Sequence, residues 1–504
     1  MPVKERKTFF MKMRNLILAF LLVSLLFTVV GCGGADESSA EPTASSEETS
    51  EAPVDTNIYP EVIDLGGREI NVLCWDWGAG SNSILGYTGE ILYSTEDKAT
   101  AVDTAKAAVI DWVEDTYHCT IGGMLDSTTE PQQIVSNMLT TGLYNYDILF
   151  ENSAKLSGMV TNGLLTDLNS VSTLHLSNSW WDQNAVKDLS IANHLYFVCG
   201  DINTYDNLGT WCVLFNKDLK EAMSIEENFY DTVRNGGWTF DHFMEICKDV
   251  THESDGTPGI NELDTWAFGT ETYNMYVQVL AGGIKIVEKD DDDLPYFTVE
   301  KRTEETYNAL NRIVEFYKSA DVMVANDGTY NGKYSNVWEG TVHKAFIEGR
   351  ELFYECGLIN VASFRQMDNE FGILPVPMTF EGQDRFYHTV SSDNSSYLAL
   401  PFGVKDEEDL GVVIEAIAMK SKEMVTPEFY DIQLKYRDTR DDESAEMLDL
   451  IFSTRSFDLG SAFRWGNILG QYMTLDTNFA SRFDAIMNTA NTAMQNSIDA
   501  ILNS

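Results

Sequence analysis

The chain has 504 residues, of which 44% are hydrophobic and 12% aromatic, and its formal net charge at pH 7 is −45. This length exceeds what one hydrophobic core usually holds, and it predicts two lobes or domains. So strong a negative charge argues against binding to nucleic acid phosphates or to an anionic lipid surface. It favours a neutral or cationic ligand.

The first 31 residues have the pattern of an export signal. Basic residues precede an almost wholly apolar run from Leu16 to Val30. The run is shorter than the roughly 20 residues that a membrane-spanning helix needs. It ends in the sequence VVGC, with Cys32 last, which resembles the lipobox of bacterial lipoproteins. The resemblance implies that residues 1–31 are removed and that Cys32, acylated with palmitate, anchors the chain on the extracellular face of the cell membrane.

Residues 32–58 form a distinct acidic stretch. They are rich in Ser, Glu, Thr, Ala and Pro, and they contain almost no large apolar side chain. Such a segment cannot bury enough surface to offset the entropy lost on folding. We therefore expect a disordered tether between the anchor and a folded body.

From residue 59 onward the chain alternates between strand-like and helix-like segments. Thr239 and Thr426 are expected to cap their helices, with Pro427 in the first turn of the second one. The alternation predicts an α/β fold with a largely parallel sheet. Strands are expected at 69–75, 146–150, 194–201, 210–216, 351–357, 371–377 and 395–401, and helices at 102–117, 132–143, 236–250, 425–436 and 479–502.

The sequence offers no recognisable catalytic or metal-binding motif. Its seven histidines are scattered, and it has neither a G-x-S-x-G elbow nor a Walker loop. Asp290–Asp293 lack the spacing of a calcium loop and are predicted to form a solvated turn. We expect no metal, no cofactor and no enzymatic activity. The cysteines after Cys32 are expected to be small buried residues, and a disulfide is worth checking between Cys199 and Cys212.

Aromatic and polar residues follow several of the expected strands. Ligands of open α/β sheets bind beyond the carboxyl ends of the strands. Aromatic rings there can stack on sugar rings, and carboxylates and amides can bind hydroxyl groups. The candidates are Trp75, Asp76 and Trp77, then Glu151, Asn152 and Ser153, then Tyr205, Asp206 and Trp211, and finally Tyr273. Four other tryptophans are assigned to the core: Trp180, Trp181, Trp238 and Trp266.

The order of three stretches resembles that in bacterial extracellular solute-binding proteins of the sugar-binding class, to which maltose-binding protein belongs. The stretches are YDILFENSAKLSGMVTNGLLTDL (146–168), LYFVCGD with WCVLFNKDL (195–219), and FGILPVP (371–377). The resemblance implies a two-lobed, periplasmic-binding-protein-like (type II) fold with the ligand cleft between the lobes. It implies that the chain crosses between lobes near 200–210, near 354–358 and after 395–401. The expected lobes are 59–205 plus 357–402 and 206–356 plus 403–504.

The resemblance also implies site residues. Trp75–Trp77 and Glu151–Ser153 match ligand-binding loops, and an acid and an aromatic residue match at Glu271 and Tyr273. A strand end and loop that carry a stacking aromatic match Tyr354, Cys356 and Gly357, where this chain has no tryptophan; this argues against maltodextrin specificity. A C-terminal stacking tryptophan matches Arg464 and Trp465.

The implied function is capture of a carbohydrate, an oligosaccharide, by hinge closure, and its delivery to the permease of an ABC transporter. We expect a monomer. Other functions stay open at this stage: a surface-anchored glycan hydrolase, a binding protein for a non-sugar solute such as a peptide, and an adhesin or structural lipoprotein. A hydrolase would need two carboxyl groups about 5–9.5 Å apart across its cleft.

Overall fold

The computed structural model describes residues 56–75, 89–93, 100–126, 129–364, 367–430 and 441–503. All of them belong to one compact unit, Thr56–Ser504. Cys32, the expected signal and residues 33–55 of the expected tether lie outside the described residues. At the end of that tether, the Ile58 N–H donates to Asn178 Oδ1 at 2.7 Å, and Asn57 Nδ2 donates to Ser179 Oγ at 2.9 Å.

The first lobe is built on a mixed five-stranded sheet in the order β2-β1-β3-β13-β4. Strand β1 runs parallel to β2 and β3, whereas β13 runs antiparallel to β3 and β4. Its strands are β1 (Arg68–Trp75), β2 (Cys119–Asp126), β3 (Ile148–Glu151), β4 (Phe197–Val198) and β13 (Tyr397–Ala399). Its helices are α2 (Ala101–Tyr117), α3 (Pro131–Thr141), α4 (Ser153–Thr161), η3 (Leu168–Ser170), α5 (Gln183–Leu189) and α15 (Glu407–Pro427).

The second lobe is built on another mixed sheet, in the order β11-β5-β10-β6-β9. Strand β5 runs antiparallel to β10 and β11, and β6 runs parallel to β10 and β9. Its strands are β5 (Trp211–Asn216), β6 (Trp266–Thr270), β9 (Val322–Val324), β10 (Glu351–Gly357) and β11 (Phe371–Leu374). Its helices are α7 (Lys217–Ala222), α8 (Phe229–Arg234), α9 (Phe240–Cys247), α10 (Asn274–Ala281), α11 (Thr298–Lys301), α12 (Thr303–Tyr317), α13 (Val337–Gly340), α14 (Val342–Ile347), η4 (Leu358–Phe364) and α16 (Asp442–Ser453).

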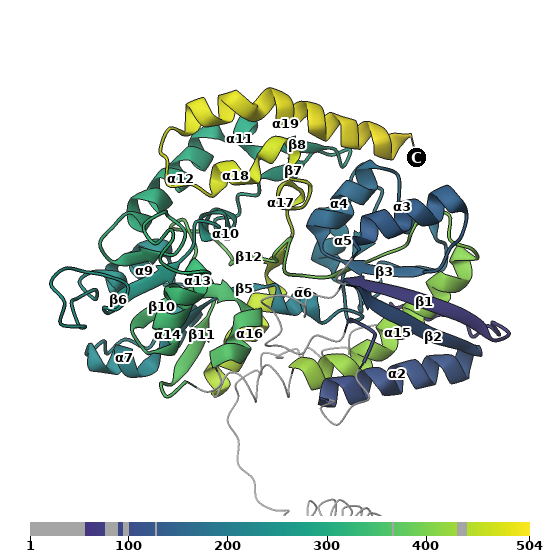
Figure 1. Cartoon of the computed structure of the whole chain (residues 1–504), viewed down its shortest axis with the longest axis horizontal. Helices are drawn as coiled ribbons and strands as arrows, with labels where there is room; N and C mark the ends of the chain where they lie inside the picture. Colours follow the sequence, from purple (N-terminus) through teal and green to yellow (C-terminus); the bar gives the residue numbers. More distant parts are fainter. Residues whose placement is uncertain are drawn as a thin grey trace, which may run out of the picture. The chain divides into compact units, whose positions relative to one another are not determined.

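The remaining elements lie where the two lobes meet (Figure 1). They include two small sheets, in which β12 pairs with β14 and β7 pairs with β8. The long C-terminal helix α19 (Phe479–Leu502) extends over both lobes. The other elements are α6 (Tyr205–Leu208), β7 (Val287–Lys289), β8 (Pro295–Phe297), β12 (His388–Thr389), β14 (Arg455–Ser456), α17 (Leu459–Phe463), η6 (Trp465–Asn467) and α18 (Leu469–Tyr472).

The chain passes between the lobes at two described segments that matter for the site. The first crossing, residues 199–210, joins β4 to β5, as expected. The expected crossing at 354–358 is not found, because β10 and the following strand β11 both lie in the second sheet. The chain crosses at residues 375–396 instead, between β11 and β13; we call this the second crossing. The lobe boundaries therefore differ from those expected: β11 lies in the second sheet, and α15 packs against α2 in the first lobe.

Hydrophobic periodicity explains the elements whose bounds match the expected ranges. Helix α2 buries one face, with Ala105, Val109 and Val113, and the Thr100 side chain caps its start by accepting from the Asp103 N–H. Strands β5 and β10 are buried along their whole length. Such uniform burial is typical of central strands covered on both faces.

Two expectations on local structure were wrong. Thr426 and Pro427 end helix α15 and do not begin a new helix, and the Thr426 hydroxyl donates to Asp201 at 2.6 Å. A proline has no N–H to bond to the carbonyl oxygen four residues before it, and its ring crowds that carbonyl, so α15 ends at Pro427. The sheets are mixed and not largely parallel, because β13 and β5 each run antiparallel to both of their neighbours.

Other expectations on the core are confirmed. Trp180, Trp181, Trp238 and Trp266 are buried. The cysteines after Cys32 are all free and buried, so Cys199 and Cys212 form no disulfide; Cys212 lies opposite Cys356 on the neighbouring strand instead. Asp290–Asp293 form a turn, in which the Asp290 carboxylate accepts from the N–H groups of Asp292 and Leu294.

Candidate functional site

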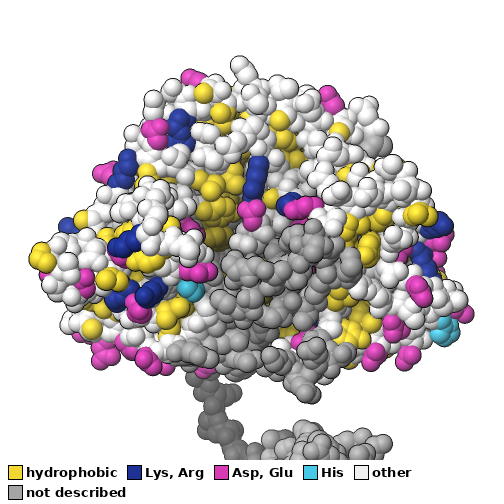
Figure 2. Space-filling model, in the orientation of Figure 1, with side chains coloured by type: hydrophobic (Ala, Val, Ile, Leu, Met, Phe, Trp, Pro, Cys, Tyr) yellow, Lys and Arg dark blue, Asp and Glu magenta, His cyan; other side chains and the backbone are white. Residues whose placement is uncertain are grey.

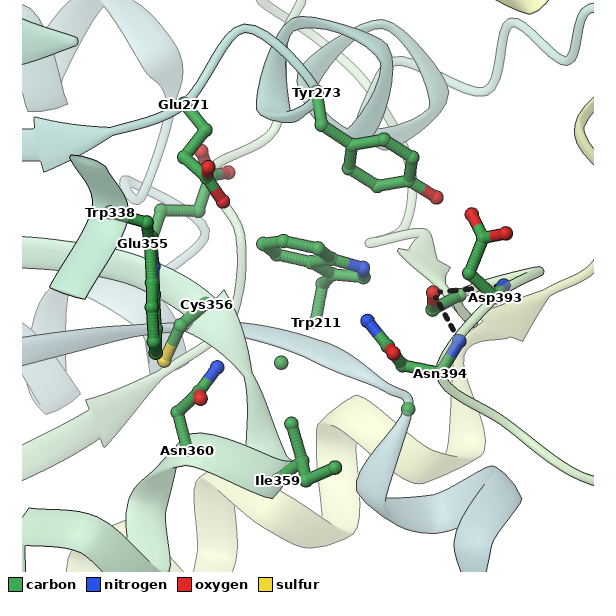
Figure 3. Close-up of a pocket in the computed structure, with 13 residues that line it drawn as sticks. Trp211, Glu271, Tyr273, Trp338, Glu355, Cys356, Ile359, Asn360, Asp393 and Asn394 are labelled. Carbon is green, nitrogen blue, oxygen red and sulfur yellow. Dashed lines mark hydrogen bonds between the residues drawn. The ribbon is translucent and has the colours of Figure 1, made fainter. Parts of the chain in front are cut away.

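A cavity of about 320 Å³ lies where the second lobe meets the two crossings. We call it the central cavity. Figure 2 shows a recess between the lobes with hydrophobic side chains at its bottom, and Figure 3 shows the residues around the cavity. Its described lining comes from both crossings, β5, the segment after β6, α13, β10 and η4: Gly209, Trp211, Glu271, Tyr273, Trp338, Glu355, Cys356, Gly357, Ile359, Asn360, Ser391, Asp393 and Asn394.

Three aromatic rings line the central cavity. Trp211 is the first residue of β5, and its ring stacks on that of Tyr273 with 5.4 Å between the ring centroids and 28° between the planes. No hydrogen-bond partner for the Trp211 Nε1–H is found among the described residues. Trp338 is held in place by stacking on His343, with 4.2 Å between centroids. The three rings therefore present flat apolar faces, and the Trp211 indole adds a free donor.

Two carboxyl groups on the cavity wall, those of Glu355 and Glu271, are largely removed from water and have no cationic partner in the described structure. Burial raises the pKa of Glu355 to about 8, although the hydroxyl groups of Tyr317 and Thr270 donate to its Oε2 at 3.2 and 3.3 Å. Its Oε1 is buried and has no hydrogen-bond partner in the described part of the chain. Burial also raises the pKa of Glu271 to about 7. Both groups can thus exchange a proton near neutral pH.

The second crossing forms the opposite wall and connects the cavity to the first lobe. The Asp393 and Asn394 N–H groups both donate to Ser391 Oγ, at 3.3 and 3.0 Å (Figure 3). The carbonyl oxygen of Ser392 accepts from the Ala154 N–H, at the start of α4, at 3.1 Å. The wall is therefore hydrogen-bonded to the first lobe at the start of α4.

The structure places five of the expected ligand residues on the central cavity: Trp211, Glu271, Tyr273, Cys356 and Gly357. Arg464 does not line it, but its guanidinium donates to the Ser392 hydroxyl at 3.1 Å and forms an ion pair with Asp393. Arg464 thus supports the wall from behind.

Glu151, Asn152 and Ser153 do not line the central cavity, and Ser153 contacts its wall segment through Ser392. Burial raises the pKa of Glu151 to about 8, and its Oε1 accepts from the Asn152 N–H at 2.7 Å. The Asn152 side chain caps α4 by accepting from the Lys155 N–H at 2.9 Å. The Ser153 hydroxyl donates to the Ser392 carbonyl at 3.4 Å.

Tyr205 and Asp206 form part of the first crossing and not of the cavity lining. The Tyr205 N–H donates to Glu90 at 3.1 Å, and Asp206 is paired with Arg455 at 2.9 Å. Arg455 also binds Asp182 of the first lobe at 2.5 Å. Burial raises the pKa of Asp206 to about 7 against the opposing effect of Arg455. These groups fix the crossing to β14.

Tyr354 and Trp465 are buried and do not line the central cavity. The Tyr354 ring packs against Phe346, with 5.4 Å between centroids. Trp465 stacks on Phe463 at 4.7 Å, and its Nε1 donates to Ser497 Oγ at 2.9 Å. Trp75 is the last residue of β1, and Asp76 and Trp77 lie outside the described residues.

Sequence reasoning missed several lining residues. Glu355 could have been found, because it is an acidic residue inside the strand ELFYECG, which is otherwise suited to burial. The polar run Ser391–Asn394 directly precedes an expected strand and was a second signal. Trp338 and Asn360 carry no such signal, because they lie on the short helices α13 and η4, which hydrophobic periodicity does not predict.

Comparison with known proteins identifies the fold. No family model matches the chain, and no curated protein matches it in sequence. Solved structures of sugar-binding proteins do match. The fold is that of the two-lobed substrate-binding proteins. The expected fold class is therefore confirmed.

Three of the matching structures illustrate the likeness. A cyclo/maltodextrin-binding protein in complex with maltotetraose is 13% identical, with a TM-score of 0.52, and the match covers 87% of this chain and 98% of that one. An ABC substrate-binding protein from Listeria monocytogenes in complex with cycloalternan is 12% identical, with a TM-score of 0.51 and coverage of 86% and 98%. A maltose-binding periplasmic protein from the same organism, in complex with maltose, is 11% identical, with a TM-score of 0.53 and coverage of 87% and 98%.

Two further findings concern the described residues alone. None of their helices is both long and apolar enough to cross a membrane. Nowhere among them do three or more His, Cys, Asp or Glu side chains come together in a way that could hold a metal ion.

Proposed function

We propose that the protein captures a carbohydrate, an oligosaccharide, in the central cavity and delivers it to the permease of an ABC transporter. The observation that carries the proposal is the stacked pair Trp211 and Tyr273, with Trp338 and unpaired polar groups around it. Aromatic faces suit the apolar faces of sugar rings, and the surrounding carboxyl and amide groups suit their hydroxyl groups. The fold shared with proteins that were solved with maltotetraose, cycloalternan and maltose supports the same class of ligand.

Binding would be coupled to a hinge movement. The two crossings connect lobes that each have their own sheet, and the cavity wall at Ser391–Asn394 is bonded to the first lobe. A ligand that contacts both walls binds the closed state more tightly and shifts the population toward it. The cavity needs no catalytic group for this role.

The cellular setting is part of the same proposal. Cys32, acylated after removal of residues 1–31, would anchor the protein on the extracellular face of the cell membrane, where it would act as a monomer beside its permease. Replacement of Cys32 by Ser should abolish incorporation of labelled palmitate and release the protein into the medium. If Cys32→Ser still incorporates the label and stays with the membrane, the anchor is elsewhere.

The first test is thermal unfolding of residues 56–504, which contain every described element, with a panel of mono- and oligosaccharides. A ligand at about 100 times its Kd should add roughly 2.7 kcal/mol to the free energy of unfolding. The midpoint should then rise by a few degrees. Recovery of the sugar unchanged would support binding without turnover.

Three outcomes would contradict the proposal. A stabilising sugar that is recovered cleaved would favour a surface-anchored glycan hydrolase. Stabilisation by peptides, with no response to any sugar, would favour a binding protein for a non-sugar solute. A response that is unchanged in Trp211→Ala would place the binding site outside the central cavity.

A further inference from the structure

The central cavity is lined by acidic side chains and by no basic ones among the described residues. Its described lining includes three carboxylic acids and no Lys, Arg or His. One of the acids, Asp393, is already neutralised by its ion pair with Arg464. Glu271 and Glu355 remain without a cationic partner among the described residues, and both side chains are drawn at the cavity in Figure 3.

Glu355 lies where one of its carboxyl oxygens can accept a hydrogen bond from a ligand. Its side chain is 3% exposed, so it lies almost wholly out of water. The hydroxyl groups of Thr270 and Tyr317 satisfy one carboxyl oxygen, and the other has no partner in the described structure. A buried acceptor left open on a cavity wall is costly unless something fills it.

Glu271, on the segment after β6, is a half-buried residue of the same wall and also lacks a cationic partner among the described residues. Burial alone is responsible for its raised pKa, with no described cation or donor to oppose the shift. The titratable groups near the two acids are Tyr317 and Cys356 beside Glu355, and Tyr354 beside Glu271. None of them carries positive charge.

The aromatic rings favour a cation as well. A protonated amine over the face of a tryptophan or tyrosine ring is attracted by the negative face of the ring, and more strongly when water is excluded. Trp211, Tyr273 and Trp338 supply such faces beside the two carboxyl groups. The same rings accept the apolar face of a sugar, so one ligand can use both properties.

We propose that the ligand is an amino sugar, whose protonated primary amine binds at Glu271 and Glu355 while its ring lies against Trp211. This inference rests on the proposed carbohydrate function and specifies it. A neutral sugar would leave the two acids with hydroxyl partners only. An ammonium group supplies up to three donors and a full charge, and charge-assisted hydrogen bonds are the stronger ones.

Binding of the amine should expel protons. Near neutral pH the empty site holds its acids partly protonated, since the pKa values of Glu271 and Glu355 are about 7 and about 8. An ammonium group beside them favours the ionised carboxylates. The protons therefore pass to solvent as the amine binds, whereas a neutral sugar should displace few.

The test is isothermal titration calorimetry of residues 56–504 at pH 7 in two buffers with different ionisation enthalpies. The probes are glucosamine and its β-1,4-linked dimer, each matched with the N-acetylated form and with glucose or cellobiose. We expect the amine-bearing sugar to bind at least about tenfold more tightly than its N-acetylated and neutral counterparts. Its apparent enthalpy should differ between the buffers, which reports the released protons.

Glutamate-to-glutamine variants remove the charge of a side chain and keep its size, so they test the role of the charge alone. Glu271→Gln and Glu355→Gln should each reduce the preference for the amine and the proton release. The matched control is Glu351→Gln, the same change on the same strand at a buried residue that does not line the cavity. Glu351→Gln should leave the preference for the amine and the proton release unchanged. Circular dichroism would confirm that all variants are folded.

The outcomes distinguish this inference from the proposed function. Equal binding of amine-bearing and neutral sugars would overturn the amino-sugar inference and leave the carbohydrate function standing. Binding of spermidine, with no response to any sugar, would overturn both. Failure of every sugar probe to bind would also overturn both. A preference for the amine that survives in Glu271→Gln and Glu355→Gln but is lost in Glu351→Gln would overturn the amino-sugar inference at these two acids and leave the carbohydrate function standing.

Discussion

Two buried glutamates, one in each lobe, show how differently the molecule uses the same side chain. Glu415 on α15 accepts four hydrogen bonds, from the indole N–H groups of Trp180 and Trp181, from Asn178 Nδ2 and from the His175 N–H, at 2.6–3.0 Å. Glu355 on β10 accepts two on one oxygen and none from described residues on the other.

Glu415 has a structural role, and Glu355 has the proposed binding role. Burial raises the pKa of both carboxyl groups, but four donors oppose the shift at Glu415. A fully satisfied acid organises the first lobe around it. An acid with an open oxygen on a cavity wall leaves part of its bonding capacity for a ligand.

Removal of Glu415 should cost the most stability. Glu415→Ala would leave four buried donors without their acceptor, and we expect a loss of about 3 kcal/mol or more in the free energy of unfolding. Urea unfolding of residues 56–504 measures it. Glu423→Ala, at an exposed position of the same helix, is the control. A loss below about 1 kcal/mol at Glu415 would show that its network is not structural.

Trp211→Ala should act on affinity more than on folding. Trp211 packs with only a small buried cluster, so its removal should weaken sugar binding by about 2 kcal/mol, or roughly 30-fold, with a smaller effect on stability. Calorimetry with the best sugar of the thermal panel measures the change. Trp112→Ala, at a half-buried position of α2 that contacts Lys420 and does not line the cavity, should not alter affinity. Equal losses of sugar affinity in Trp211→Ala and Trp112→Ala would contradict direct contact between Trp211 and the sugar.

The empty protein should lose stability as the pH rises from about 5 to about 8. The folded-state pKa of Glu355 lies above its unfolded value, so the folded state binds more protons in this window and is penalised as they leave. Glu355→Gln should remove part of this slope, at most about 1.4 kcal/mol per pH unit. Urea unfolding at pH 5.5 and 8 measures the change in the free energy of unfolding.

The control is Glu305→Gln. In this variant the slope should persist, since Arg302 lowers the pKa of Glu305 and keeps it ionised throughout. An unchanged slope in Glu355→Gln would refute the assignment of this pH dependence to Glu355.

Asp393→Asn should have the smallest effect on stability. Its ion pair with Arg464 is partly exposed on both sides, and such pairs contribute less than about 1 kcal/mol. Urea unfolding at low and high salt measures the contribution. A loss well above this value would mean that the pair holds the second crossing in place.

Much of the fold follows from local patterns. Helices α2 and α19 and strands β5 and β10 lie where hydrophobic periodicity places them, because each buries one continuous face or a whole segment. The course of the chain after β10 does not follow from such patterns. The pairing of β11 with β5 depends on contacts far apart in sequence, and no local signal distinguishes it from a return to the first lobe.

The site was predictable only in part for a similar reason. Trp211, Glu271 and Tyr273 lie at or directly after strands, where residues of an open sheet reach a ligand. Trp465 has the same residue type as a stacking ligand residue, but its indole bonds to Ser497 in the core. The surroundings of a tryptophan, which decide between core and cavity, are set by the tertiary fold.

Helix α19 has a mechanical consequence for how the cavity exchanges its ligand. One end of the helix packs through Phe479 and Phe483 against Tyr307 on α12, and the other end binds α4 through Ser497 and Thr161. A rigid rod fixed at both ends resists being stretched, so the lobes cannot simply separate along it. We expect α19 to keep the lobes at a fixed distance on its own side, so that they open by rotating about an axis that crosses the helix, and the gap widens most on the side of the molecule farthest from α19 (Figure 1).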